Sequence, residues 1–175
     1  MRDSANPDIT QRKSAFRRKT ANASMEVALS PMPKLLKAVL SDVIDLQTQL
    51  TFGHWNAGGP RPWKVQRMTE AFSEELQEDT EALCDRVMAL CDRATGISAV
   101  AVESSKMPEY VCVPKTEKGH LLALVGSYAF VAKQAESAVD AAIHSKDHLS
   151  AGLLISLSCR LNEHLSYLKD AAQTN

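Results

Sequence analysis

A cluster of carboxylates between positions 70 and 92 is the feature of this sequence that could bind a metal ion. Eight acidic side chains stand there against one basic side chain, Arg86. At 100° per residue, five of the acids fall on one face of a helix. Carboxylates so arranged suit a hard cation such as iron, manganese or magnesium, and the alternative is a solvated outer face. The five that share the face are Glu70, Glu74, Glu78, Glu81 and Asp85.

A histidine upstream of these acids is their obvious partner. His54, followed by Trp55, ends the apolar pattern that precedes them, although a histidine at a helix end can equally be a cap or a core contact. A di-iron site within one subunit requires Glu-x-x-His on two helices, and the motif occurs once, at Glu117 and His120. We therefore expect a metal site on the acidic helix to need ligands from another subunit.

Four amphipathic segments must position these side chains. Apolar residues recur at spacings of three and four, and glycines and prolines at 58–62 separate the first two segments. Residues 92–117 form a long crossover with at most one short helix. This order predicts an all-α, ferritin-like four-helix bundle in which the second and third helices lie parallel. The expected helices cover about 31–56, 65–90, 120–144 and 148–172.

The first 28 residues are expected to form a disordered basic arm, ahead of a bundle at 29–175. Residues 1–24 carry six basic and two acidic side chains and almost no large apolar ones. Such an arm can neutralise phosphates, so non-specific DNA binding is one interpretation, and a solvated terminus without a partner is the other. The residues expected to contact DNA are Arg12, Lys13, Arg17, Arg18 and Lys19.

Composition excludes several other classes of protein. A chain of 175 residues, 45% of them hydrophobic, is about the size of one domain with a single core, and 5% aromatic residues argue against an all-β class. No apolar run approaches the ~20 residues that a membrane helix needs, and the N-terminus lacks the apolar core of a secretory signal. We expect a cytoplasmic protein with no membrane partner, whose four cysteines are reduced because none forms a CxxC pair.

Short motifs lie at fixed places along the expected helices. They are His54-Trp55-Asn56 with Gly58 or Gly59, Asp85-Arg86-Val87, His120-Leu121, and Tyr128-Ala129-Phe130-Val131-Ala132. Together, over about residues 35–170, they resemble the Dps family of miniferritins. The resemblance implies a dodecameric shell that takes up ferrous iron, oxidises it with hydrogen peroxide and stores the ferric mineral inside. In many members of that family the shell also binds DNA.

The resemblance also implies an oxidation centre between two subunits. By position, His54 and Glu70 of one chain would bind iron (Fe2+/Fe3+) together with Glu81 and Asp85 of its mate, and Trp55 would lie close by. The activity implied is that of a ferroxidase, an oxidoreductase that acts on metal ions.

Gln66 is the main departure from the family's pattern, because a second histidine ligand usually stands at that position. An amide oxygen is a weaker, neutral ligand, and Thr51 replaces a frequent lysine nearby. Two alternatives follow: a DNA-compacting cage whose oxidation centre is weak or absent, and a bundle with an unrelated partner. In the leading interpretation Glu74 and Glu78 line the cavity and nucleate mineral.

Overall fold

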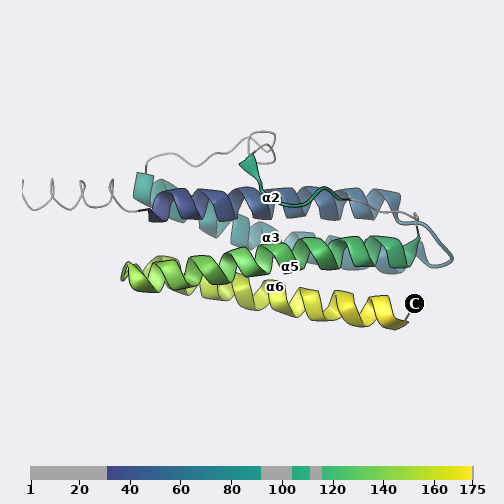
Figure 1. Ribbon diagram of the computed structural model, residues 1–175. Coiled ribbons are helices and arrows are strands. Elements are labelled where there is room, and N and C mark those ends of the chain that lie inside the picture. Colours follow the sequence, from purple (N-terminus) through teal and green to yellow (C-terminus); the bar gives the residue numbers. More distant parts are fainter. Residues whose placement is uncertain (1–30, 92–103, 111–115, 175) are drawn as a thin grey trace, which may run out of the picture. The chain divides into compact units, whose positions relative to one another are not determined.

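The computed structural model describes residues 31–91, 104–110 and 116–174, and these ranges contain helices and no β-strand. The expected basic arm at 1–28 lies outside them. The chain divides into two units, and the unit Met32–Asn175 holds the bundle. None of the described helices is long and apolar enough to cross a membrane. The helices are α2 (Met32–Asn56), α3 (Pro62–Cys91), α5 (Glu117–His144) and α6 (His148–Thr174) (Figure 1).

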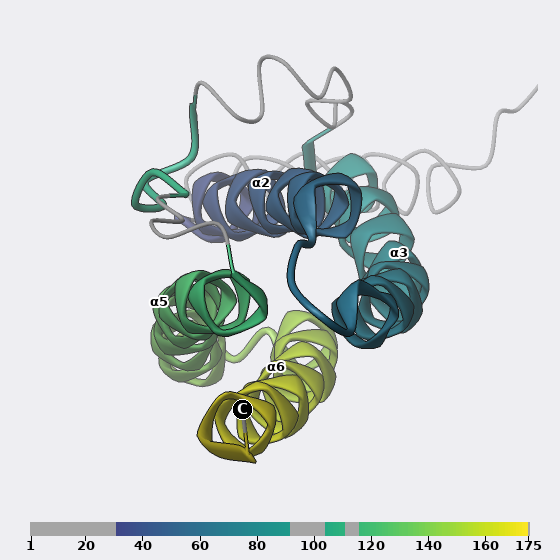
Figure 2. The same ribbon diagram turned by 90° about the vertical axis from the view of Figure 1, so that its right-hand side faces the viewer.

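The four helices form the expected bundle of two hairpins. α2 packs against α3, α5 packs against α6, and α2 also contacts α5. Viewed from the end, the pair of α2 and α3 lies above the pair of α5 and α6 (Figure 2). The colour gradient in Figure 1 shows that α3 and α5 run in the same direction. This is the connectivity of ferritin-like bundles.

Local signals explain where the helices begin and end. α3 starts at Pro62, whose missing N–H and fixed φ suit a first helical position, after a turn in which Gly59 has φ 104°. α5 starts three residues earlier than expected because the Thr116 side chain accepts a hydrogen bond from the Gly119 N–H at 3.1 Å. Lys146, with φ 59°, makes the left-handed turn that separates α5 from α6.

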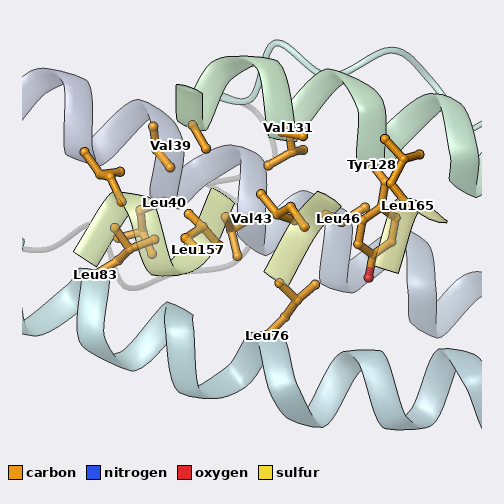
Figure 3. Packing of buried hydrophobic residues seen from close by; sticks show 14 of the residues in the cluster. Val39, Leu40, Val43, Leu46, Leu76, Leu83, Tyr128, Val131, Leu157 and Leu165 are labelled. Carbon is orange, nitrogen blue, oxygen red and sulfur yellow. The ribbon is translucent and has the colours of Figure 1, made fainter. Parts of the chain in front are cut away.

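Leucine and valine side chains from all four helices fill the centre of the bundle. Each fully buried aliphatic side chain contributes about 1.5–3 kcal/mol through removal from water, so this core dominates stability. Its spacing of three and four residues is the periodicity that predicted the helices. Figure 3 labels ten of the buried residues: Val39, Leu40, Val43, Leu46, Leu76, Leu83, Tyr128, Val131, Leu157 and Leu165.

The described part of the crossover, residues 104–110, is fastened to α2 by buried polar groups. Ser105 Oγ donates to Asp42 Oδ1 at 2.9 Å, and burial raises the pKa of Asp42 above its ordinary value despite this bond. Tyr110 Oη lies 3.0 Å from His120 Nδ1. A Cβ added at Gly53 would meet the same Tyr110 oxygen at 3.2 Å. The crossover therefore packs closely behind the last turn of α2, which carries His54.

Candidate metal centre

A hollow of about 250 Å³ lies between the last turns of α2 and the first half of α3. Among the residues predicted to handle iron, His54, Glu70 and Glu74 line it together. The hydroxyls of Thr51 and Ser73 add polar atoms to the wall. The complete lining is Leu50, Thr51, His54, Thr69, Glu70, Ser73 and Glu74.

The backbone of α3 holds the imidazole of His54. Its Nδ1 lies 3.1 Å from the carbonyl oxygen of Gln66 and 3.5 Å from Thr69 Oγ1. A carbonyl oxygen only accepts, so Nδ1 carries the proton and donates it. In this tautomer Nε2 keeps its lone pair, which is the state of a histidine ready to bind a metal ion.

Gln66 contributes its main chain rather than its side chain to this arrangement. Its carbonyl orients His54, while its half-buried side chain is not part of the wall of the hollow. A site formed here therefore begins with one imidazole and the carboxylates of α3.

The carboxylates of Glu70 and Glu74 are exposed and lack a compensating cation. Neither makes an ion pair or a hydrogen bond with any residue in the described part of the chain. Like charges four residues apart on a helix are destabilising by about 0.2–0.5 kcal/mol. A cation bound between them would remove this repulsion.

Glu81 and Asp85 lie farther along the same helix. Gln77 Nε2 donates to Glu81 Oε1 at 2.8 Å, and Gln47 Nε2 donates to Gln77 Oε1 at 3.3 Å, so the side chain of Glu81 is positioned from α2. Eleven residues separate Glu70 from Glu81, a rise of about 16 Å along a helix. The two groups of ligands cannot meet within one chain, and over the described ranges no three His, Cys, Asp or Glu side chains converge as a metal site.

Trp55 follows His54 and exposes 75% of its surface, and Phe52 of the same turn is 45% exposed. Two large aromatic side chains on the last turns of α2 therefore keep much of their surface uncovered by the described residues. Exposed apolar groups of this size beside polar ligands are typical of a surface that another chain covers.

Comparisons with known proteins agree with this geometry. No family model matches the chain. A curated relative, the DNA protection during starvation protein of Agrobacterium fabrum, is 27% identical over 155 residues, covering 89% of this chain and 96% of the relative. Among solved structures, a mutant of Mycobacterium smegmatis Dps1 superposes with a TM-score of 0.75 at 23% identity, over 81% of this chain and 94% of that one.

A second solved structure, DPS protein from Vibrio cholerae O1, has a TM-score of 0.75 at 14% identity and covers 84% of this chain and 91% of its own. That protein is described as a member of a broad superfamily of ferritin-like diiron-carboxylate proteins. The chain is therefore similar in sequence to a Dps protein and shares the fold of Dps proteins. This similarity agrees with the resemblance seen in the His54 and Asp85 motifs.

The structure contains a second charged cluster that the sequence pattern did not reveal. Arg160 of α6 lies 2.9 Å from Asp79, 3.5 Å from Glu78 and 3.7 Å from Glu75. Burial raises the pKa of Asp79 above its ordinary value, although the charge of Arg160 opposes this. The acidic helix therefore has one paired side, facing α6, and one unpaired side at the hollow. Glu78, predicted to nucleate mineral, has a cation beside it, whereas Glu74 does not.

Arg86, the centre of the Asp-Arg-Val motif, binds the turn between α5 and α6. Its Nη2 lies 2.7 Å from Asp147 Oδ1, and its Nε donates to Ser150 Oγ at 2.9 Å. Asp147 also accepts the Ser150 N–H at 3.1 Å and so caps α6. Burial raises the pKa of Asp147, but the bonds from Ser150 and the Arg86 guanidinium outweigh it and leave that pKa below its ordinary value.

Proposed function

We propose that this chain is a Dps protein that sequesters iron, protects DNA, and oxidises Fe(II) at a centre shared by two subunits. His54 and Glu70 form one half of the centre, and Glu81 and Asp85 of the neighbouring subunit form the other. The observation that carries the proposal is the state of His54, whose Nδ1 is bound to the Gln66 carbonyl while Nε2 keeps its lone pair beside Glu70. The distance of about 16 Å between the two halves on α3 is the reason for requiring two chains.

Iron is the substrate in this proposal, and the chain's residues bind and orient it. Imidazole and carboxylate ligands together suit Fe(II), and carboxylates favour the harder Fe(III) product. Each hydrogen peroxide takes one electron from each of two ferrous ions, and hydrolysis of the ferric product releases protons to water. Trp55 lies beside the centre.

The proposed assembly is a closed shell of twelve chains. Closed symmetric oligomers are the usual solution when each subunit carries both halves of a shared site. Inside the shell, the uncompensated Glu74 is better suited to nucleate ferric mineral than Glu78, which lies beside Arg160. The basic arm, through Arg12, Lys13 and the cluster at 17–19, would bind DNA without sequence preference in the cytoplasm.

The test is an anaerobic Fe(II) load followed by a pulse of peroxide, with absorbance read for ferric product. His54→Ala should slow oxidation markedly without changing the sedimentation coefficient of the shell. His148→Ala, which removes an exposed histidine at the start of α6, is the matched control and should leave the rate unchanged. A monomer or simple dimer at micromolar concentration would exclude the shell.

A second candidate is a DNA-compacting cage with a weak oxidation centre. The observation that favours it is the side chain of Gln66, which brings no imidazole and does not line the hollow. This candidate predicts normal assembly and DNA retardation together with Fe(II) oxidation no faster than in buffer.

A further inference from the structure

Three polar side chains from three helices form a continuous row of hydrogen bonds from the interior of the bundle to its surface. Tyr128 of α5 is fully buried, and its Oη lies 3.3 Å from Nδ1 of His164 on α6. Nε2 of His164 lies 2.9 Å from Oε2 of Glu75 on α3. The side chain of His164 is 3% exposed, whereas that of Glu75 is 49% exposed. This row of hydrogen bonds therefore connects the buried phenol of Tyr128 with the Glu75 carboxylate, which is in contact with solvent.

The direction of each hydrogen bond follows from the groups present. The carboxylate of Glu75 only accepts, so Nε2 of His164 carries a proton and donates it. Burial lowers the pKa of His164, so the ring is neutral at pH 7 and Nδ1 accepts from the phenol of Tyr128. Burial, together with the charge of Glu75, raises the pKa of Tyr128 well above its ordinary value, so the phenol keeps its proton. Both donated protons thus point toward solvent.

Such a row of hydrogen bonds does more than provide a hydrogen-bond partner for the buried hydroxyl of Tyr128. A carbonyl oxygen would have been a sufficient partner for Nε2 of His164, but a carbonyl cannot take up its proton. A carboxylate such as that of Glu75 can take up the proton, and half of this side chain is in contact with water. Arg160 Nη1 lies 3.7 Å from the same Oε2 atom.

The aromatic ring of Phe72 on α3 packs against both Tyr128 and His164. Phe72 stacks on His164 with ring centroids 3.8 Å apart and an interplanar angle of 6°. Its centroid is 6.0 Å from that of Tyr128. Phe72 precedes Ser73, which lines the hollow beside His54 and Glu70. Tyr128 is thus one aromatic contact away from a residue beside the wall of the hollow.

We propose that Tyr128 is a redox-active residue that reduces a radical of the hydroxyl class while its phenolic proton leaves through His164 and Glu75. In the first step Tyr128 gives one electron to the hydroxyl radical. The phenolic proton moves to Nδ1, the Nε2 proton moves to Glu75 and then to water, and a phenoxyl radical and hydroxide result. In the second step Fe(II) gives one electron to the phenoxyl, which takes a proton back along the same path. The net change is one hydroxyl radical, one ferrous ion and one proton converted to water and one ferric ion.

The use of this path with iron rests on the proposed function, because the radical arises when a single ferrous ion reduces peroxide by one electron. The ability of Tyr128 to be oxidised does not rest on the proposed function. It can be tested without iron, so a failure of either proposal is recognisable by itself.

The test uses the full-length protein with Tyr110→Phe and Tyr167→Phe, which leaves Tyr128 as the only tyrosine of the chain's three. Photogenerated tris(bipyridine)ruthenium(III) serves as the one-electron oxidant, and electron paramagnetic resonance detects the radical. Ring-deuterated tyrosine should change the hyperfine pattern, which distinguishes a tyrosyl radical from one on either tryptophan. We expect a tyrosyl signal, and its absence would overturn the proposal.

The proton path is tested by Glu75→Gln in the same background. The amide oxygen can still accept the hydrogen bond from His164 but cannot take the proton. Since a positioned proton acceptor contributes about 10²–10⁴-fold in rate, radical formation should slow at least about tenfold. Glu78→Gln is the matched control, because Glu78 also lies beside Arg160 but does not contact His164. Equal rates in Glu75→Gln and the parent would refute the path.

Discussion

Complementation between two inactive variants tests the shared centre directly. One chain carries His54→Ala with Glu70→Ala, and the other carries Glu81→Ala with Asp85→Ala. The two groups of ligands are about 16 Å apart along α3, whereas iron–oxygen and iron–nitrogen bonds measure about 2 Å, so no side-chain rotation unites them in one subunit. Each variant alone should therefore assemble but oxidise Fe(II) at the background rate.

Mixed shells should recover activity that neither parent has. With equal amounts of two randomly assorted chains, a centre is intact only when the first chain keeps His54 and Glu70 and its neighbour keeps Glu81 and Asp85. That condition holds for about one quarter of the centres in a shell built on two-chain sites. Co-expression with two different affinity tags, followed by sequential purification, yields the mixed shells, and stopped-flow absorbance after peroxide gives the rate.

The possible outcomes separate the arrangements clearly. A rate near one quarter of the wild-type rate supports the two-chain centre. Background activity in the mixed shells would refute it, because a centre within one chain is broken in both variants. Glu136→Ala with Asp140→Ala removes an exposed acidic pair of the same spacing from α5 and should leave the wild-type rate intact.

Three further predictions follow from particular residues. Gln66→His should speed Fe(II) oxidation by adding an imidazole, and an unchanged rate at saturating peroxide would mean that ligation at this position does not limit the reaction. Arg86→Ala should lower the free energy of unfolding by about 1.5–3 kcal/mol in denaturant titrations at pH 7, since it removes charged hydrogen bonds to Asp147. Because the pKa of Asp147 lies below its usual 3.8, the stabilisation is present above that value and should disappear as the pH falls through the lowered pKa. Finally, full-length protein should retard duplex DNA at low salt with a steep salt dependence, whereas a chain starting at Met25 should not; equal retardation by both would place DNA contact elsewhere.

The helices were predictable because their burial is periodic. Leu36, Leu40, Val43 and Leu50 recur at spacings that match one helical face, and the structure buries all of them. The start of α5 was predicted three residues late because a capping threonine has no apolar periodicity. The side chain of Thr116 supplies the local signal that was overlooked.

The candidate centre was predictable in part. His54 and Glu70, which the family resemblance implies as ligands, line the same hollow, and their binding of iron stays a prediction. The pairing of Glu75 with His164 joins residues 89 positions apart, and helical periodicity contains no information about which helix will lie opposite. The function of the Gln66 carbonyl was equally invisible, because side-chain identity does not report where a backbone oxygen points.

The hydrogen bond between His54 and the Gln66 carbonyl separates two tasks, the orientation of a histidine ligand and the binding of the metal ion. Metal sites usually assign both tasks to side chains. Every residue in a well-formed helix presents nearly the same carbonyl, so the orientation of His54 survives any exchange at position 66 that leaves the helix intact. A longer or better-ligating side chain at position 66 that reaches the hollow, as proposed for Gln66→His, would then change metal affinity while the neighbouring imidazole stays aligned. For protein engineering, the effect of such a substitution on ligation is separable from the orientation of His54.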